Sequence, residues 1–350
     1  MGIDDRKQRV LRAIVTLYGS AGEPVGSSLL AEYFDRAVSS ATLRNEMAAL
    51  TKLGLLEQPH TSAGRVPSAK GYRYYLDNLL DVPARLTAGR KAEIDSLFAG
   101  LDYDPEHLAE GAARALSQTT GYIAVATTPQ SDDMCVAHYE VVQAGLSTAV
   151  VLAVTGAGGV RTRTVKLDFA LHVGDTQRAA AALNRCLTFR NAADVNEDTL
   201  HAAADSLGDK AMLLYPILSA AVTLLREGGR ASIYVEGQQR ALDYEGIPEG
   251  SFRNLLALLS DPNAVRRVVN PPSPRTMVLL GDDVQDYPIP GLCIMGRRYL
   301  AGGGRTGAIA LVGPTRMPYR DLIPQLEYYA LLLGECMSGK GGNLENDNRG

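Results

Sequence analysis

At 350 residues the chain is long enough for two or three domains, because a single hydrophobic core stops growing near about 250 residues. Its 46% hydrophobic and 21% charged residues are typical of a globular protein, and no apolar run approaches the ~18 residues of a membrane span. The first residues lack the apolar core of a signal peptide, so we expect a cytoplasmic protein with no membrane partner.

The cysteines and histidines are too scattered to form a local metal or redox motif. Successive cysteines are separated by more than 40 residues, and the five histidines form no HxxxH pair. We therefore expect no metal site, no cofactor, and small buried thiols. The cysteines are Cys135, Cys186, Cys293 and Cys336.

Motifs of enzymes are also missing from the sequence. No Ser/His/Asp or Cys/His arrangement and no Walker loop stands in a suitable context, so we predict that the chain is not an enzyme. Gly302, Gly304 and Gly307 spell GxGxxG, but they precede a strand-like run. A dinucleotide-binding fingerprint follows a strand and opens a helix, which argues against nucleotide binding.

The net charge of −4 hides a local excess of positive charge near the N-terminus. Residues 1–80 contain ten Lys/Arg and eight Asp/Glu, whereas the remainder contains 25 and 31. Between Arg36 and Tyr75 there are six basic residues and two acidic ones. This pattern predicts a polyanionic partner for the N-terminal segment, with an ordinary solvated face as the alternative.

The N-terminal segment has the element order of a helix-turn-helix domain. Apolar residues at helical spacing predict one helix over 10–18 and a short second helix from Ser27 or Ser28. A third helix is expected from its cap at Ser39 to Gly54. A short strand from Leu55, a polar loop and a returning Val66 then predict the wing of a winged helix.

The start of the third helix carries side chains suited to reading DNA. In helix-turn-helix proteins this part of the third helix meets base edges in the major groove. Arg44 can pair with guanine, Asn45 with adenine, and Thr42 can contact phosphate or a thymine methyl group. The alternative is that these residues form only the polar side of an ordinary helix.

Further candidates lie in the wing, over phosphates or the minor groove, and at the start of a fourth helix over 68–80. The tyrosines of that helix are expected in the core. The complete set of candidate DNA-binding residues is Ser39, Ser40, Thr42, Arg44, Asn45, His60, Thr61, Ser62, Arg65, Lys70 and Arg73.

Two stretches resemble signatures of a known family. VSSATLRNEMAALTKLGLLEQPHTSAGRVPSAKGYRYYLD, residues 38–77, resembles the N-terminal signature of HrcA, the bacterial heat-inducible transcription repressors. GAIALVGPTRMPY, residues 307–319, is similar to the family's C-terminal signature. The resemblance implies a homodimeric repressor that binds an inverted-repeat operator in double-stranded DNA upstream of chaperone operons, with a chaperonin as the partner that keeps it active. It also implies a GAF-like domain carrying an inserted dimerisation domain.

The rest of the chain alternates between strand-like and helical segments. Strand-like runs cover 121–167, helical patterns begin at Asp175, and strands resume over 275–313 after a predicted hairpin within 231–245. The apolar helix over 209–227 contains Pro216, which should kink or split it. In "GPTRMPY", Arg316 could hold an anion, although a turn into a closing helix is the simpler interpretation.

This order predicts an α+β multidomain chain with an N-terminal winged helix-turn-helix and an α+β domain interrupted by an inserted one. The HrcA resemblance implies that these are a GAF-like α+β domain and an inserted α/β dimerisation domain. The predicted parts are the winged helix-turn-helix at 1–80, a linker and helix at 81–103, the GAF-like domain at 104–169 and 273–337, the insert at 170–272, and a disordered tail at 338–350.

Three functions are compatible with this organisation. The prediction is a DNA-binding repressor controlled by a protein partner. The alternatives are a one-component regulator whose GAF-like domain senses a small metabolite, and an enzyme with an accessory winged helix. A pocket lined only by apolar side chains favours the first over the second, and convergent polar groups favour the second. The third requires a cleft with titratable groups of perturbed pKa.

Overall fold

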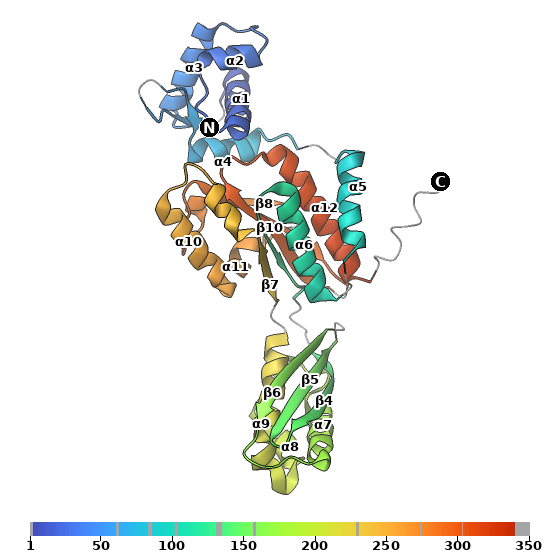
Figure 1. Cartoon of the computed structure of the whole chain (residues 1–350). Coiled ribbons are helices and arrows are strands. Elements are labelled where there is room, and N and C mark those ends of the chain that lie inside the picture. Colours follow the sequence, from blue (N-terminus) through green and yellow to red (C-terminus); the bar gives the residue numbers. More distant parts are fainter. Residues whose placement is uncertain are drawn as a thin grey trace, which may run out of the picture.

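The computed structural model describes residues 3–60, 63–82, 86–101, 104–130, 135–156, 159–228, 231–273, 275–302 and 304–339. The chain forms three parts that follow one another in space: an N-terminal domain, a central domain and an inserted domain (Figure 1). The predicted α+β fold with an N-terminal winged helix-turn-helix is confirmed.

The N-terminal domain has the predicted helix order and a short wing. Its elements are α1 (Asp5–Ala21), α2 (Ser27–Tyr33), α3 (Ser40–Lys52), β1 (Leu56–Glu57), β2 (Val66–Pro67) and α4 (Ala69–Asn78). The two strands pair antiparallel, and an isolated bridge joins Val25 to Arg65 at the base of the wing. The apolar faces of the helices bury Leu11, Ile14 and Leu43 in one small core.

The central domain is built on a five-stranded antiparallel sheet with helices on both faces. The strand order is β7-β3-β10-β9-β8, with β3 (Ile123–Thr127), β7 (Ile233–Glu236), β8 (Met277–Leu280), β9 (Leu292–Leu300) and β10 (Thr306–Pro314). Helices α5 (Ala88–Ala99), α6 (Pro105–Thr120) and α12 (Tyr319–Met337) belong to one core, and α10 (Glu249–Ser260) and α11 (Pro262–Val269) to the other. Short 3-10 turns lie at Gln238–Asp243 and Gly281–Asp283.

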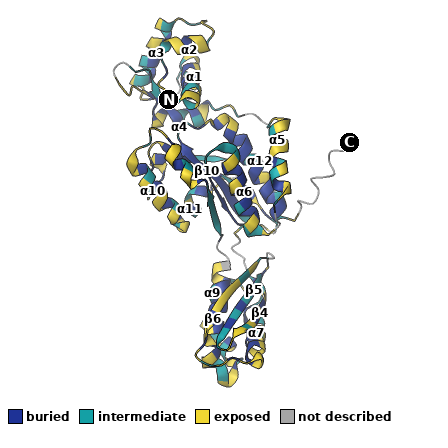
Figure 2. Cartoon of the chain, viewed as in Figure 1, coloured by how far each residue is buried: buried dark blue, intermediate teal, exposed yellow. Residues whose placement is uncertain are grey.

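Side chains of the sheet alternate between these two cores. Ala124 and Ala126 belong to the core with α6 and α12, whereas Ile123 and Val125 belong to the core with α10 and α11. In the central domain, buried residues gather on the sheet and the inner helix faces, while exposed residues lie on the outer side of α5 (Figure 2). The inner strands β3, β9 and β10 are therefore buried on both faces, which explains their nearly continuous apolar sequence, whereas the edge strands β7 and β8 are mostly half-buried.

The inserted domain is a three-stranded antiparallel sheet covered on one face by helices. It contains β4 (Val136–Gly145), β5 (Thr148–Thr155), β6 (Val160–Lys166), α7 (Val173–Leu187), α8 (Glu197–Asp205) and α9 (Ala211–Gly228), with 3-10 turns at Ala192–Asp194 and Gly208–Lys210. Residues from all three strands and all three helices form one separate hydrophobic core.

The predicted bounds of the insert differ from the structure. We expected 136–166 in the GAF-like domain and 249–269 in the insert. Instead, β4, β5 and β6 form a sheet of their own against α7 and α9, while α10 and α11 pack on the central sheet. The error has a physical cause, because alternating strands fit either sheet, and the helices that cover this one, α7 and α9, follow later in the sequence.

The predictions for the hairpin, the cysteines and the C-terminal tail have different outcomes. The hairpin expected within 231–245 is wrong, since β7 pairs with β3 and a 3-10 turn follows it. Three cysteines are buried as expected, but Cys135 is half-buried. In the predicted tail, Ser338 and Gly339 form a turn after α12, and 340–350 lie outside the described residues.

Helix α9 departs from two expectations. The helix continues through Pro216 without a break. Among the described residues, one helix, Gly208–Glu227, is long and apolar enough to cross a membrane by length and composition, whereas we expected no such stretch. Because α9 contacts β5 and β6 and buries Leu214, Ile217 and Leu225, we interpret it as the core helix of the insert.

Candidate nucleic-acid interface

Three hydroxyl side chains order the start of α3. The Ser39 Oγ accepts a hydrogen bond from the Thr42 N–H at 3.1 Å and lies 2.8 Å from the Thr42 Oγ1. The Ser40 Oγ donates to the Ser27 Oγ at 3.0 Å, which connects α3 to α2. Ser39 is therefore the helix cap expected from the sequence, and such a cap contributes about 1 kcal/mol.

The next turn presents Arg44 and Asn45 to solvent. Leu43, Met47 and Leu50 occupy the buried face of α3, so helical periodicity turns Arg44 and Asn45 outward. In the part of the chain that the structure describes, neither side chain has a hydrogen bond or ion pair. Both can therefore meet a ligand without breaking an existing contact.

Glu46 is the acidic residue of α3, and basic residues of α1 surround it. The Lys7 Nζ lies 3.3 Å and the Arg6 Nη1 3.9 Å from the Glu46 carboxylate. Lys7 also pairs with Asp4, and this hydrogen bond lowers the pKa of Asp4 and raises that of Lys7. The positive charge of α1 thus offsets a carboxylate that would repel phosphate.

The wing contributes fewer free side chains than expected. His60 is exposed in the loop between β1 and β2, whereas Thr61 and Ser62 lie outside the described residues. Arg65 is half-buried, and its Nε donates to the Thr51 Oγ1 of α3 at 3.2 Å. Arg65 therefore anchors the wing to α3, where we had expected it to lie over phosphates.

Gly64 permits the close approach at the base of the wing. A Cβ atom at this position would lie 2.3 Å from the carbonyl oxygen of Val25, which is closer than real side chains come. The adjacent Arg65 exchanges two backbone hydrogen bonds of 2.9 Å with Val25. A larger residue at position 64 would push the wing away from the helices.

Lys70 and Arg73 have structural contacts inside the protein. The Lys70 Nζ donates to the Leu53 carbonyl at 2.9 Å, which caps the C-terminal end of α3, opposite the end that carries Arg44. Arg73 forms an ion pair with Asp283 and donates to the Val278 carbonyl at 3.2 Å, both in the central domain. The expectation that these two residues reach phosphates is therefore not supported by their positions.

Arg36 is a candidate that we did not predict. It lies in the turn between α2 and α3, is exposed, and adopts a left-handed backbone with φ of 59°. Its N–H donates to the Ala31 carbonyl at 2.8 Å, which holds the turn. The sequence did point to this residue, because the stretch with an excess of basic residues begins at Arg36.

Comparison with known families identifies the chain. Residues 3–78 match the winged helix-turn-helix transcription repressor, HrcA DNA-binding domain, and residues 106–323 match the HrcA protein C-terminal domain. The chain belongs to the HrcA family. The heat-inducible transcription repressor HrcA of Desulforudis audaxviator (strain MP104C) is 33% identical over 341 residues, covering 94% of this chain and 96% of that protein.

Other matches to the HrcA family extend over the same length. The heat-inducible transcription repressor HrcA of Rhodococcus jostii (strain RHA1) is 33% identical over 343 residues, covering 96% of this chain and 98% of that protein. A crystal structure of a hypothetical protein at 2.2 Å resolution covers 97% of this chain and 100% of its own with a TM-score of 0.64, at 22% identity. That likeness shows that the two chains share a fold.

HrcA membership assigns the broad role of the chain. It is a member of a family of heat-inducible transcription repressors with a DNA-binding winged helix, and repression is not an enzymatic role. No group of three or more His, Cys, Asp or Glu side chains that could hold a metal lies within the described residues. The side chains available for function at this end of the molecule are those around the start of α3.

Proposed function

We propose that this HrcA-family chain represses transcription by binding an inverted-repeat operator of chaperone operons as a homodimer in the cytoplasm. Arg44 and Asn45 read base edges in the major groove. Ser39, Ser40, Thr42 and Arg36 lie nearest to them and contact phosphates, and the wing residues His60, Thr61 and Ser62 contact the backbone or the minor groove.

The observation that carries this proposal is the pair of free, exposed side chains at the first turns of α3. Arginine fits guanine bidentately and asparagine fits adenine, and each good pair contributes roughly 1–3 kcal/mol of discrimination. The N-terminal end of α1 carries Arg6, which lies 3.9 Å from Glu46 of α3, and Arg36 adds a positive charge in the turn before α3. Arg65, Lys70 and Arg73 are omitted because each has a contact within the protein.

A dimer follows from the small size of one reading surface. One winged helix presents a single short helix, and non-specific affinities of ~10⁻⁴ to 10⁻⁶ M cannot single out an operator in a genome. A two-fold dimer places two such helices on a pseudo-palindrome. Binding of an inverted repeat and dimerisation are thus one proposal.

We infer that the inserted domain forms the dimer contact through the exposed side of α9. Met212 is 91% exposed, Tyr215 53% and Leu213 47%, and all three lie in the first turns of this helix. Such an apolar face is unfavourable in water and is typical of a protein interface. A second copy of the chain covers it in this proposal.

Matched substitutions test the dimer contact. Met212→Glu and Tyr215→Glu should convert the protein to monomers in sedimentation experiments and abolish operator binding at concentrations that saturate the parent. Leu242→Glu is the control, since Leu242 is 87% exposed but lies in the central domain. If the two α9 variants remained dimers like the control, the contact would lie elsewhere.

Footprinting of the purified protein on its own upstream DNA tests the function as a whole. We expect protection of an inverted repeat, with two chains per site by native mass spectrometry. Protection of a single half-site by one chain would contradict the dimer. If no site upstream of chaperone genes were protected, the operator assignment would be contradicted.

A further inference from the structure

A cavity of about 400 Å³ lies between the N-terminal domain and the central domain. Tyr18, Gly22 and Tyr72 line it from the N-terminal domain, and Gly281 and Arg316 line it from the central domain. Its volume is within the range of small-molecule pockets, about 300–1,000 Å³. The cavity is separate from the start of α3 and plays no part in the proposed DNA contacts.

Arg316 supplies a cation to this cavity. It follows β10 and lies against the C-terminal turn of α1, so that a Cβ on Gly22 would be 2.3 Å from the Arg316 Nη1. The carbonyl end of a helix attracts a positive charge. Among the described residues its side chain has no ion pair or hydrogen bond, and its planar group of donors fits a carboxylate.

Tyr72 supplies a second polar group at the wall. Its side chain is buried, and its hydroxyl has no hydrogen-bond partner among the described residues. Burial raises the pKa of Tyr72 well above its usual value, so the hydroxyl stays neutral and can donate. An unpaired buried hydroxyl is unfavourable, and the adjoining cavity is the space from which a partner can come.

The remaining lining limits which ligands fit. Glu245 and Asp282 are exposed at the cavity, and their carboxylates repel a multiply charged anion. Ile247, Leu280 and Pro67 supply apolar surface. A nucleotide or a polyphosphate is therefore disfavoured, whereas a singly charged molecule with an apolar body is favoured.

We propose that this interdomain cavity binds a small monocarboxylate, with its carboxylate on Arg316 and its body against the apolar wall beside Tyr72. Such a ligand contacts both domains at once. Because it binds only when the domains are docked, it favours the docked orientation of the winged helix and changes the affinity for operator DNA.

Benzoate is the test probe, since it joins one carboxylate to a rigid apolar ring. Benzamide has the same shape without the charge, and inorganic phosphate is a compact anion. Calorimetry and saturation-transfer NMR with the full-length protein should give saturable binding of benzoate and none of benzamide. Arg316→Gln should weaken benzoate at least about tenfold, as expected for one charged hydrogen-bonded pair.

Three further variants keep the test independent of folding defects. Tyr72→Phe preserves the ring and should weaken benzoate by about threefold to tenfold. Asp282→Asn removes a repulsive charge at an exposed position and should tighten binding. Arg320→Gln makes the same charge change as Arg316→Gln at an exposed residue outside the lining and should leave the affinity unchanged.

Several outcomes would overturn the proposal. The proposed carboxylate site would be refuted if benzamide and benzoate bound equally. It would also be refuted if both Arg316→Gln and Asp282→Asn left the affinity for benzoate unchanged. Tighter binding of phosphate than of benzoate would replace it with an inorganic anion site. Unchanged operator affinity at saturating benzoate would overturn the coupling. Benzoate binding needs no DNA, so failure of the repressor proposal would be recognised separately by footprinting.

Discussion

At the scale of single residues, the end of α3 that we propose faces DNA combines one cation, one amide and one carboxylate paired with basic residues. Arg44 and Asn45 are exposed and unpartnered among the described residues, while Glu46 is neutralised by Arg6 and Lys7. If Glu46 lacked those partners, its charge would weaken phosphate binding beside the two reading residues. The acidic residue of α3 therefore serves to dock α1 and does not oppose DNA.

Arg44→Ala and Asn45→Ala should each reduce discrimination between the operator and a base-substituted operator by roughly 1–3 kcal/mol. The reason is that each side chain reads one base edge and has little role in the fold. Fluorescence anisotropy at fixed salt with both DNA duplexes measures the difference. Lys52→Ala, at the other end of α3, is the control. It should cause only a small decrease in affinity, and the decrease should be the same for both duplexes.

This prediction has a clear contrary outcome. If Arg44→Ala and Asn45→Ala weakened the operator and its substituted form by the same factor, the two side chains would bind phosphate and sequence would be read elsewhere.

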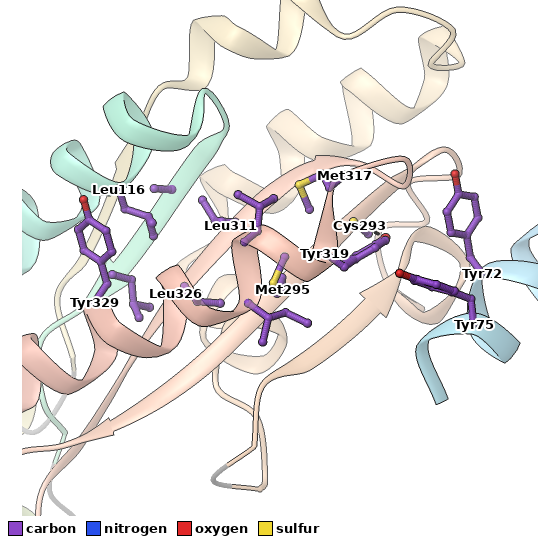
Figure 3. Packing of buried hydrophobic residues seen from close by; sticks show 14 of the residues in the cluster. Tyr72, Tyr75, Leu116, Cys293, Met295, Leu311, Met317, Tyr319, Leu326 and Tyr329 are labelled. Carbon is purple, nitrogen blue, oxygen red and sulfur yellow. Dashed lines mark hydrogen bonds between the residues drawn. The ribbon is translucent and has the colours of Figure 1, made fainter. Parts of the chain in front are cut away.

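At the scale of elements, α4 belongs to the winged helix but also docks it on the central domain. Arg73 pairs with Asp283, and the rings of Tyr72 and Tyr319 lie edge to face with centroids 6.5 Å apart. Figure 3 shows Tyr72 and Tyr75 of α4 beside Tyr319 at the start of α12. These residues belong to one continuous hydrophobic core, so the two domains are docked and are not joined only by a linker.

Arg73→Ala should loosen this docking without removing a DNA contact. We expect operator affinity to change while the slope of affinity against salt stays that of the parent, because a lost phosphate contact alone would lower the slope by about one unit. Asp283→Asn should have the same effect, and the double variant should add little to either. A salt slope reduced only in Arg73→Ala would restore this residue to the DNA interface.

In the insert, Asp175 and Lys210 join the starts of α7 and α9. The Lys210 Nζ lies 2.5 Å from the buried Asp175 carboxylate, which also accepts from the His172 N–H at 3.2 Å. The hydrogen bond from Lys210 lowers the pKa of Asp175. A lowered pKa in the folded state means that the pair stabilises the fold above the unfolded value of ~3.9 and ceases to do so as the pH falls through the folded pKa.

Lys210→Met should therefore destabilise the insert at pH 7 by ~1.5–3 kcal/mol, the usual contribution of a hydrogen bond to a charged group. Hydrogen exchange of the α7 amides measures the local opening. The difference from the parent should shrink as the pH falls below the unfolded value of ~3.9 and should be lost below the lowered pKa of folded Asp175. Lys166→Met, an exposed lysine of the same domain, is the control. A pH-independent difference would mean that Lys210 acts through packing.

The elements themselves could be predicted from the sequence, whereas their grouping could not. Caps such as Ser39 and Ser68 act within three residues, so helix starts are encoded locally. Whether β4 and β5 join the central sheet or form their own is decided by packing, because β4 contacts α7 and β5 contacts α9, which both follow later in the sequence. Likewise, only the folded chain brings Arg73 to Asp283, a contact that the sequence did not predict.

At the scale of the whole molecule, contacts of the described residues join the insert to the central domain near Thr128 and Ser232. Thr128 and Ser232 exchange hydrogen bonds of 2.8 and 2.9 Å where the chain leaves and re-enters the central domain. Beside them, Arg161 pairs with Glu106 at 3.1 Å. The insert therefore folds around its own core and presents its outer surface independently of the DNA-binding end.

Large apolar side chains are exposed at several places on the insert. Leu146 is 82% exposed, Phe189 75% and Met212 91%. Phe189 is held outward in a left-handed backbone with φ of 56°, which is strained for a bulky residue. Exposed apolar side chains promote aggregation or bind a chaperone when partner subunits separate.

The resemblance to HrcA implies control by a chaperonin, and we propose this control for the chain, with the exposed apolar residues of the insert as its support. On mild heating, purified protein should aggregate and lose operator binding, because separated subunits expose the apolar residues of the insert. Added chaperonin should restore binding, whereas chaperonin saturated with unfolded substrate should not, since mass action then leaves little free to act on the repressor. Operator binding after refolding, with and without chaperonin, is the measurement. Equal recovery in both would contradict chaperonin control and favour a ligand at the interdomain cavity as the main regulator.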